Sequence, residues 1–177
     1  MPTSAKLVVS VLVITAVSAV GLWLVGGKKQ EYSAAIEIDA SPDVVFNYLT
    51  DPEKQKSWIK GLSEVARHQS NTDEDGASRR ITTTRVISVD GQETRFEDQV
   101  LRFDLDRSLT VRSSNSDQIV TAIFQLEPRD EQTSMMYRLN RVSCGINRFL
   151  APLSNDTTQS RIDDEIRKLK QLVESGH

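Results

Sequence analysis

Two charged residues in the middle of the chain are the best placed to do chemistry together. Arg85 and Asp98 stand on either side of Asp90-Gly91, a dipeptide typical of a two-residue β-hairpin turn. Such a turn fixes which residues of its two arms face each other. The resulting register places Arg85 and Asp98 on one face as diagonal neighbours, within side-chain reach. Because each charge would be costly to bury alone, we expect the two to form an ion pair.

The face that carries this pair is predicted to be the buried one. It also holds Ile81, Ile87, Val89, Phe96 and Val100. A paired arginine keeps some hydrogen-bond donors free, so the pair is interpreted as the polar anchor for the carbonyl or carboxylate of an otherwise apolar ligand. The alternative is a purely structural pair, or one at the edge of the sheet in solvent.

Aromatic and sulfur-containing side chains on other segments could complete the wall of a cavity. Alternation along the predicted strands puts several of them on the same face as the charged pair. The same alternation is also typical of an ordinary hydrophobic core. The residues predicted to contact a ligand are Arg85, Asp98, Phe96, Tyr137, Met135, Phe124 and Trp58.

The sequence contains no recognisable catalytic constellation. The single cysteine, Cys144, has no histidine near it in sequence, and neither a nucleophile-elbow motif nor a glycine-rich phosphate loop occurs. His68 and His177 are the only histidines, which excludes zinc-type spacing. We therefore predict no catalytic residue, no metal site and no cofactor, and enzymatic activity is the less favoured alternative.

The charge balance argues against a nucleic-acid partner. The 177 residues include 22 Lys and Arg against 25 Asp and Glu, for a formal net charge of −3. Basic and acidic residues are interleaved, whereas a protein that binds phosphate backbones normally has a basic face or stripe. The length and the ordinary apolar content fit one globular domain.

Turn and capping signals predict the elements that must position these residues. A strand is predicted from Tyr32 to Ile38, a helix after Ser41-Pro42-Asp43, and a second short helix from Asp51-Pro52 toward Trp58, ended by Gly61. Six strand candidates follow between residues 62 and 141, separated by turn signals at 73–76, 90–91, 104–107, 115–117 and 129–132. The predicted fold class is α+β, with the helices on one face of a curved antiparallel sheet.

The chain from Ile146 to Val173 is predicted to hold the long helix that covers this sheet. Its second half carries an apolar stripe made of Ile162, Ile166, Leu169, Leu172 and Val173. A continuous helix from about Ile146 is the favoured interpretation, which would direct Asn155 and Thr158 into the cavity. The alternative is a helix that starts afresh near Thr157, with the preceding segment as a flap over the cavity mouth.

The N-terminal segment from Leu7 to Val25 contains no charged residue and would reach roughly 28 Å as a helix, close to the thickness of a bilayer core. We predict a single-pass membrane span here, with a cleavable signal peptide as the rival interpretation and the orientation left open. The predicted organisation is residues 1–29 as membrane anchor and hinge, and residues 30–177 as the folded domain.

The run from Ile36 to Glu53 (IEIDASPDVVFNYLTDPE), followed by Trp58 and later by Ile166 to Glu174, resembles the polyketide cyclase/dehydrase and lipid-transport family. This family belongs to the START and Bet v 1-like (SRPBCC) superfamily. The resemblance implies the helix-grip fold, with a deep cavity between sheet and long helix that holds hydrophobic small molecules. Membrane-anchored members are a familiar variant.

The functional expectation is therefore a membrane-anchored protein that binds a hydrophobic small molecule or lipid between its sheet and its C-terminal helix. One alternative is an enzyme of the cyclase or aromatase type, which would need an acid-base group deep in the cavity. Another is a protein-interaction module whose cavity is collapsed, with a volume below roughly 300 Å³.

Overall fold

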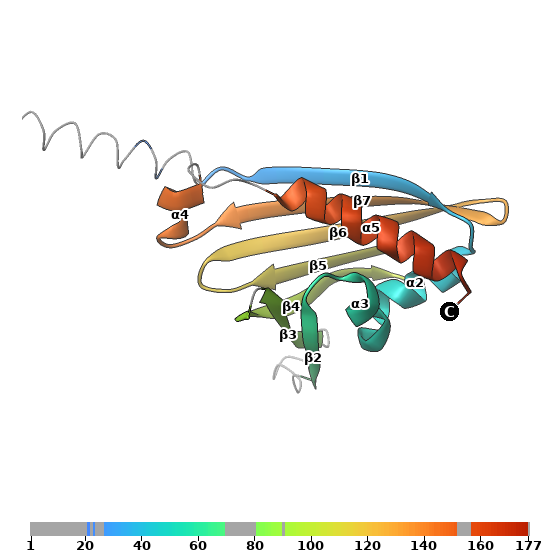
Figure 1. The fold of residues 1–177 in the computed structure, drawn as a ribbon, viewed down its shortest axis with the longest axis horizontal. Coiled ribbons are helices and arrows are strands. Elements are labelled where there is room, and N and C mark those ends of the chain that lie inside the picture. The colour runs from blue at the N-terminus through green and yellow to red at the C-terminus, as the bar shows by residue number, and fades with distance from the viewer. Residues whose placement is uncertain are drawn as a thin grey trace, which may run out of the picture.

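The structure is a computed structural model that describes residues 21, 23, 27–69, 81–89, 91–151 and 157–176. In this part of the chain seven strands form one antiparallel sheet in the order β1-β7-β6-β5-β4-β3-β2 (Figure 1). The strands are β1 (Gln30–Ile38), β2 (Leu62–Gln69), β3 (Ile81–Val89), β4 (Gln92–Asp104), β5 (Ser108–Ser114), β6 (Gln118–Arg129) and β7 (Gln132–Ser143). The helices are α2 (Pro42–Thr50), α3 (Pro52–Trp58), α4 (Asn147–Leu150) and α5 (Thr158–Glu174). The predicted α+β helix-grip fold is confirmed.

The β3–β4 hairpin has the predicted register. Pairing runs from Val89 opposite Gln92 to Thr82 opposite Gln99. Gly91 has a φ of +78°, a left-handed backbone that glycine adopts readily. Arg85 and Asp98 are therefore diagonal neighbours on one face of the sheet.

A β-bulge interrupts the pairing between β4 and β5. The register shifts between Val100 and Arg102, and on the far side of this shift Asp98 lies opposite Ser113. Counted back from the pair at the turn, Asp104 with Ser108, an uninterrupted ladder would have put Ser114 opposite Asp98. Because alternate side chains point to opposite faces, the bulge decides that Ser113 shares a face with Asp98.

The two short helices begin as their capping signals predict. Ser41 precedes α2, which has Pro42 in its first turn. Asp51 caps α3, where its Oδ1 accepts hydrogen bonds from the backbone N–H of Glu53 at 2.8 Å and of Lys54 at 3.4 Å. The two helices pack on each other and form a layer on the same face of the sheet, with α2 against β6 and β7 and α3 against β2.

Helix α5 buries one stripe against the sheet, beside β1. It is held there by two polar contacts to β1 and the residue after it: Lys170 Nζ donates to the Glu37 carbonyl at 2.6 Å, and Glu174 Oε1 accepts from the Asp39 N–H at 2.8 Å. The apolar residues of the stripe that are at most 4% exposed are Ile162, Ile166, Leu169 and Val173. The predicted inward face of this helix is confirmed.

The predicted continuity of the last helix is wrong. Helix α4 ends at Leu150, and α5 begins at Thr158 after a non-helical Thr157 with φ −95° and ψ 10°. Thr158 is not part of the cavity wall; it is buried, and its Oγ1 accepts a hydrogen bond from Arg141 Nη1 at 2.8 Å. Asn155, the other predicted inward residue, lies outside the described residues.

The predicted membrane span requires a correction. Within the residues that the structure describes, no helix has both the length and the apolar character needed to cross a bilayer. This finding overturns the predicted single-pass membrane localisation. The segment from Leu7 to Val25, apart from Gly21 and Trp23, lies outside the described residues.

Candidate ligand-binding site

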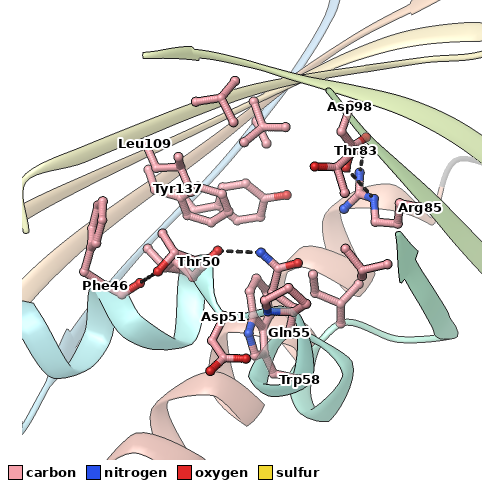
Figure 2. A pocket seen from close by; sticks show the side chains of 18 of the residues that line it. Phe46, Thr50, Asp51, Gln55, Trp58, Thr83, Arg85, Asp98, Leu109 and Tyr137 are labelled. Carbon is pink, nitrogen blue, oxygen red and sulfur yellow. Dashed lines mark hydrogen bonds and ion pairs between the residues drawn. The ribbon is translucent and has the colours of Figure 1, made fainter. Parts of the chain in front are cut away.

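A cavity of about 770 Å³ lies between the sheet and the short helices (Figure 2). Strands β2 to β7 form its floor, and α2 and α3 form most of the opposite wall. Helix α5 contributes only Arg161 and Glu165, because its apolar stripe is packed into the hydrophobic core. The cavity thus faces the sheet as expected, but its second wall is mainly α2 and α3 rather than the C-terminal helix.

Most of the residues predicted from the sequence lie in the cavity wall. Trp58, Arg85, Asp98, Phe124 and Tyr137 all line it. Met135 is fully buried in the hydrophobic core, and Phe96 is buried without being part of the wall. These two were predicted because of strand alternation alone, which places a side chain on a face but not at a cavity.

The charged pair is formed, with a geometry short of ideal. Arg85 Nε lies 3.2 Å from Asp98 Oδ2, and their side chains are only 20% and 12% exposed. The Nη2 atom donates to Asp98 Oδ1 at 3.5 Å, the long limit for a hydrogen bond. The contact at Nε is an ion pair without a hydrogen bond. The pair is therefore buried at the cavity wall but is not a bidentate clamp.

Ser113 completes this cluster and was not predicted from the sequence. Its hydroxyl accepts a 2.7 Å hydrogen bond from Arg85 Nη2, and it also lowers the pKa of Asp98, so the two side chains interact favourably. Ser113 is 2% exposed. Burial raises the pKa of the Asp98 carboxyl, and the attraction of Arg85 and the bond to Ser113 offset this effect only in part.

Three aromatic rings make a continuous section of the wall. The rings of Phe124 and Tyr137 are stacked, with centroids 4.4 Å apart and planes 6° from parallel. Trp58 meets Phe124 edge-on at 6.4 Å, and its Nε1–H donates to the Tyr48 carbonyl at 3.0 Å. Because its indole N–H is satisfied by protein, Trp58 offers the cavity an apolar surface.

Glu165 is a second buried carboxyl at the cavity that sequence reasoning missed. Its Oε1 accepts a 3.2 Å hydrogen bond from the Lys60 N–H and lies 3.8 Å from Arg161 Nε. Burial raises the pKa of Glu165 despite the lowering effect of Arg161 and of the bond from Lys60. The only sequence signal for its burial was weak: Glu165 is next to the apolar stripe of α5, and its sequence context is that of an ordinary acidic residue on a helix surface.

An apolar rim marks the opening of the cavity. Phe103 and Leu105 line it and are 57% and 65% exposed. The Phe103 ring packs edge-on against Phe46 of α2, with centroids 5.2 Å apart. These exposed apolar side chains offer contact area to a hydrophobic molecule at the cavity.

The described residues contain no group of three or more His, Cys, Asp or Glu placed to hold a metal ion. The two buried carboxyls at the cavity, Asp98 and Glu165, are each next to an arginine instead. What the arrangement can do chemically is to bind an apolar body and to offer hydrogen bonds at one polar end.

Solved structures with the same fold are numerous. A Thermus thermophilus protein, TTHA0849, is 17% identical, with a TM-score of 0.63 over 82% of this chain and 98% of that chain. The aromatase/cyclase ZhuI from a Streptomyces species is 10% identical, with a TM-score of 0.63 over 83% and 94% of the two chains. Ara h 8.0201 is 11% identical, with a TM-score of 0.60 over 84% and 100%. At these identities the likeness shows the fold alone.

No curated protein sequence matches this chain. The profile of the family described as polyketide cyclase / dehydrase and lipid transport, however, matches residues 29–174. This match spans β1 to the end of α5, and so covers every element that builds the cavity. The chain therefore belongs to the polyketide cyclase/dehydrase and lipid-transport family.

Proposed function

We propose that this protein binds a hydrophobic small molecule or lipid in the cavity between its sheet and helices α2 and α3. The observation that carries this proposal is the cavity itself: about 770 Å³ with a largely apolar wall and one buried charged cluster. Such a volume lies in the usual range of small-molecule sites, roughly 300 to 1,000 Å³. It also argues against the alternative of an interaction module with a collapsed cavity.

Within this site we assign Arg85, Asp98 and Ser113 the role of polar anchor. Asp98 and Ser113 hold the guanidinium in place from two neighbouring strands. The remaining N–H groups of Arg85 are then free to reach an oxygen of the ligand. An apolar ligand with one polar end would be oriented by this cluster, with its body against Phe124 and Trp58.

The binding proposal is tested with a neutral apolar dye, N-phenylnaphthylamine, added to the full-length chain with methyl-labelled alanine. The Ala122 methyl group lines the cavity, whereas that of Ala35 is exposed on β1. We expect the Ala122 NMR signal to shift in a saturable way with one dye per chain, and the Ala35 signal to stay in place. Absence of saturable binding, or a shift of the Ala35 signal alone, would contradict the proposal.

A cyclase-type enzyme is the second candidate, because Glu165 and Tyr137 put titratable groups on the cavity wall. Its test is incubation with a flexible chain bearing several ketone groups, followed by mass spectrometry. Ring closure by aldol condensation forms one carbon–carbon bond and releases one water, so a product lighter by one water supports the enzyme. Recovery of the polyketone unchanged, together with evidence that it binds, favours the binding function over the enzyme.

A further inference from the structure

The hydroxyl of Tyr137 opens onto the cavity, and no group in the described part of the chain is hydrogen-bonded to it. Tyr137 is 5% exposed and lines the cavity, and within the described part of the chain its hydroxyl makes no hydrogen bond. Figure 2 shows this hydroxyl directed toward the side of the cavity where Thr83 and Arg85 lie. A tyrosine hydroxyl in a largely apolar wall normally has a partner, so this phenol is available to hydrogen-bond a molecule held in the cavity.

The charges around this hydroxyl are already balanced by one another. Arg85 is paired with Asp98, and Arg161 with Glu165. Lys60, the third basic residue of the wall, is exposed to solvent and reaches Glu165 through its backbone N–H. Among the described residues that line the cavity, three are basic and five are acidic; the acidic ones are Asp43, Asp51, Asp98, Asp106 and Glu165.

A ligand carboxylate would therefore be buried without an uncompensated positive charge to receive it. Burying an unpaired charge is far more costly than burying a neutral polar group that finds a hydrogen bond. The phenol supplies such a bond, because its own charged form is disfavoured: burial raises the pKa of Tyr137, and nearby Glu165 raises it further. The hydroxyl thus keeps its proton and acts as a donor.

Building on the proposed binding function, we infer that the ligand is a neutral hydrophobic molecule with a carbonyl-type oxygen, and that Tyr137 recognises this oxygen by donating a hydrogen bond to it. Arg85, held by Asp98 and Ser113 on the neighbouring strands, lies on the side toward which the phenol points and offers further donors. Carboxylic acids in their ionised form are discriminated against by the acidic excess of the wall.

The test compares three naphthalenes of similar size that carry an acetyl, an ethyl or a carboxylate group at the same ring position. Each is used at neutral pH to displace N-phenylnaphthylamine from the full-length chain. Because one net hydrogen bond corresponds to a roughly 2- to 12-fold change in affinity, acetylnaphthalene is expected to bind better than ethylnaphthalene by such a factor. Naphthoate is expected to bind most weakly.

The Tyr137→Phe variant removes only the hydroxyl and should reduce the advantage of acetylnaphthalene over ethylnaphthalene to the part that the Arg85 donors supply. Tyr48→Phe is the matched control, since Tyr48 is equally buried but donates to the Leu172 carbonyl and is not part of the cavity wall. It should leave the advantage in place. Thermal unfolding of both variants checks that the fold is intact.

The possible failures are distinguishable. If the dye binds but the acetyl compound has no advantage over the ethyl compound, or keeps it undiminished in Tyr137→Phe, the inference is wrong and the proposed function stands. If naphthoate binds at least as well as acetylnaphthalene, the ligand class is anionic and the inference is wrong. If the dye itself does not bind, the proposed function fails and the inference fails with it.

Discussion

Arg85 on β3 donates a 2.7 Å hydrogen bond to the hydroxyl of Ser113 on β5, across the whole width of the intervening strand β4. Asp98, on β4, lies between them, forms an ion pair with Arg85 and stands opposite Ser113 in the β4–β5 ladder. Three strands are thus connected by one buried polar cluster on the cavity wall. In the proposed function this cluster positions the guanidinium for a ligand, and we expect its members to depend on one another energetically.

Removal of the Asp98 carboxylate should destabilise the fold strongly. Asp98→Ala leaves the Arg85 charge buried without its partner, which is expected to cost about 3 kcal/mol in the free energy of unfolding. The double variant Arg85→Met with Asp98→Leu should cost much less, because no unpaired charge remains. Urea denaturation measures the free energy of unfolding of both variants.

As a control, Asp164→Ala removes an exposed ion pair with Arg167 and should cost under about 1 kcal/mol. Equal effects of Asp98→Ala and the double variant would contradict a coupled pair.

The same double variant tests the anchor role of the pair in binding. If the free donors of Arg85 orient the ligand, the variant should bind acetylnaphthalene several-fold more weakly and N-phenylnaphthylamine almost unchanged. Dye displacement measures both affinities. Arg112→Met, which removes an exposed guanidinium from β5, is the control and should change neither. If the folded double variant binds acetylnaphthalene as well as the unsubstituted protein does, the anchor role of Arg85 is wrong. Recognition at this cluster would then depend on shape and apolar contact.

The Ser113 hydroxyl should contribute measurably to stability. Ser113→Ala removes the acceptor of Arg85 Nη2 and the favourable effect of the hydroxyl on the Asp98 carboxylate, and leaves both groups less satisfied. We expect a loss of about 1 to 3 kcal/mol in the free energy of unfolding. Ser114→Ala is the matched control, because Ser114 points to the other face and should change stability by under about 0.5 kcal/mol. If Ser114→Ala lost more stability than Ser113→Ala, Ser114 rather than Ser113 would share a face with Asp98, and the register shift in β4 would be contradicted.

Glu165 should make the fold less stable as the pH rises. Its pKa is raised in the folded state, so the folded protein holds this proton more tightly than the unfolded chain does. The stability associated with the protonated carboxyl is fully present below the ordinary pKa of glutamate and is lost as the pH rises through the raised value. The gain in stability from Glu165→Gln should therefore grow with pH over this window, as measured by urea denaturation at a series of pH values.

Glu174 is a control whose pKa is shifted in the opposite direction from that of Glu165. The hydrogen bond from Lys170 lowers the pKa of Glu174, so its contribution is present above the ordinary glutamate pKa and is lost on acidification. Glu174→Gln should consequently be the less stable protein at neutral pH and approach the unsubstituted protein at low pH. The same slope for both variants would contradict the assignment of Glu165 as a buried, destabilised carboxylate.

Gly61 should tolerate a side chain far less well than Gly91. Both have a φ of +78°, so alanine is strained at either position. At Gly61, however, an added Cβ would clash with the backbone oxygen of Ser88, whereas at Gly91 nothing lies within 4 Å. Gly61→Ala should therefore lower the melting temperature clearly more than Gly91→Ala. Similar melting temperatures would mean that the contact between the α3–β2 turn and β3 is loose.

Local sequence signals were enough to predict the β3–β4 hairpin and the start of α3, although not the break before α5. The Asp90-Gly91 turn determined the register of β3 and β4, and hence the neighbourhood of Arg85 and Asp98, because a two-residue hairpin allows one pairing. The start of α3 at Pro52 was predicted from the Asp51 cap, which is also a contact between residues close in sequence. The order of predicted strands and helices indicated the α+β class, and the family resemblance implied the helix-grip fold. The apolar N-terminal run, by contrast, led to a membrane prediction that the described structure overturned.

What only the tertiary structure decided depends on contacts between segments far apart in the chain. Whether Ser113 or Ser114 meets Asp98 is set by a one-residue bulge in β4, and no turn signal in the sequence encodes it. The burial of Glu165, the unpaired hydroxyl of Tyr137 and the choice of α2 and α3 as the second wall all follow from how helices dock on the sheet. Docking sums many small contacts over the whole core, whereas sequence periodicity reports only which face of each element is apolar.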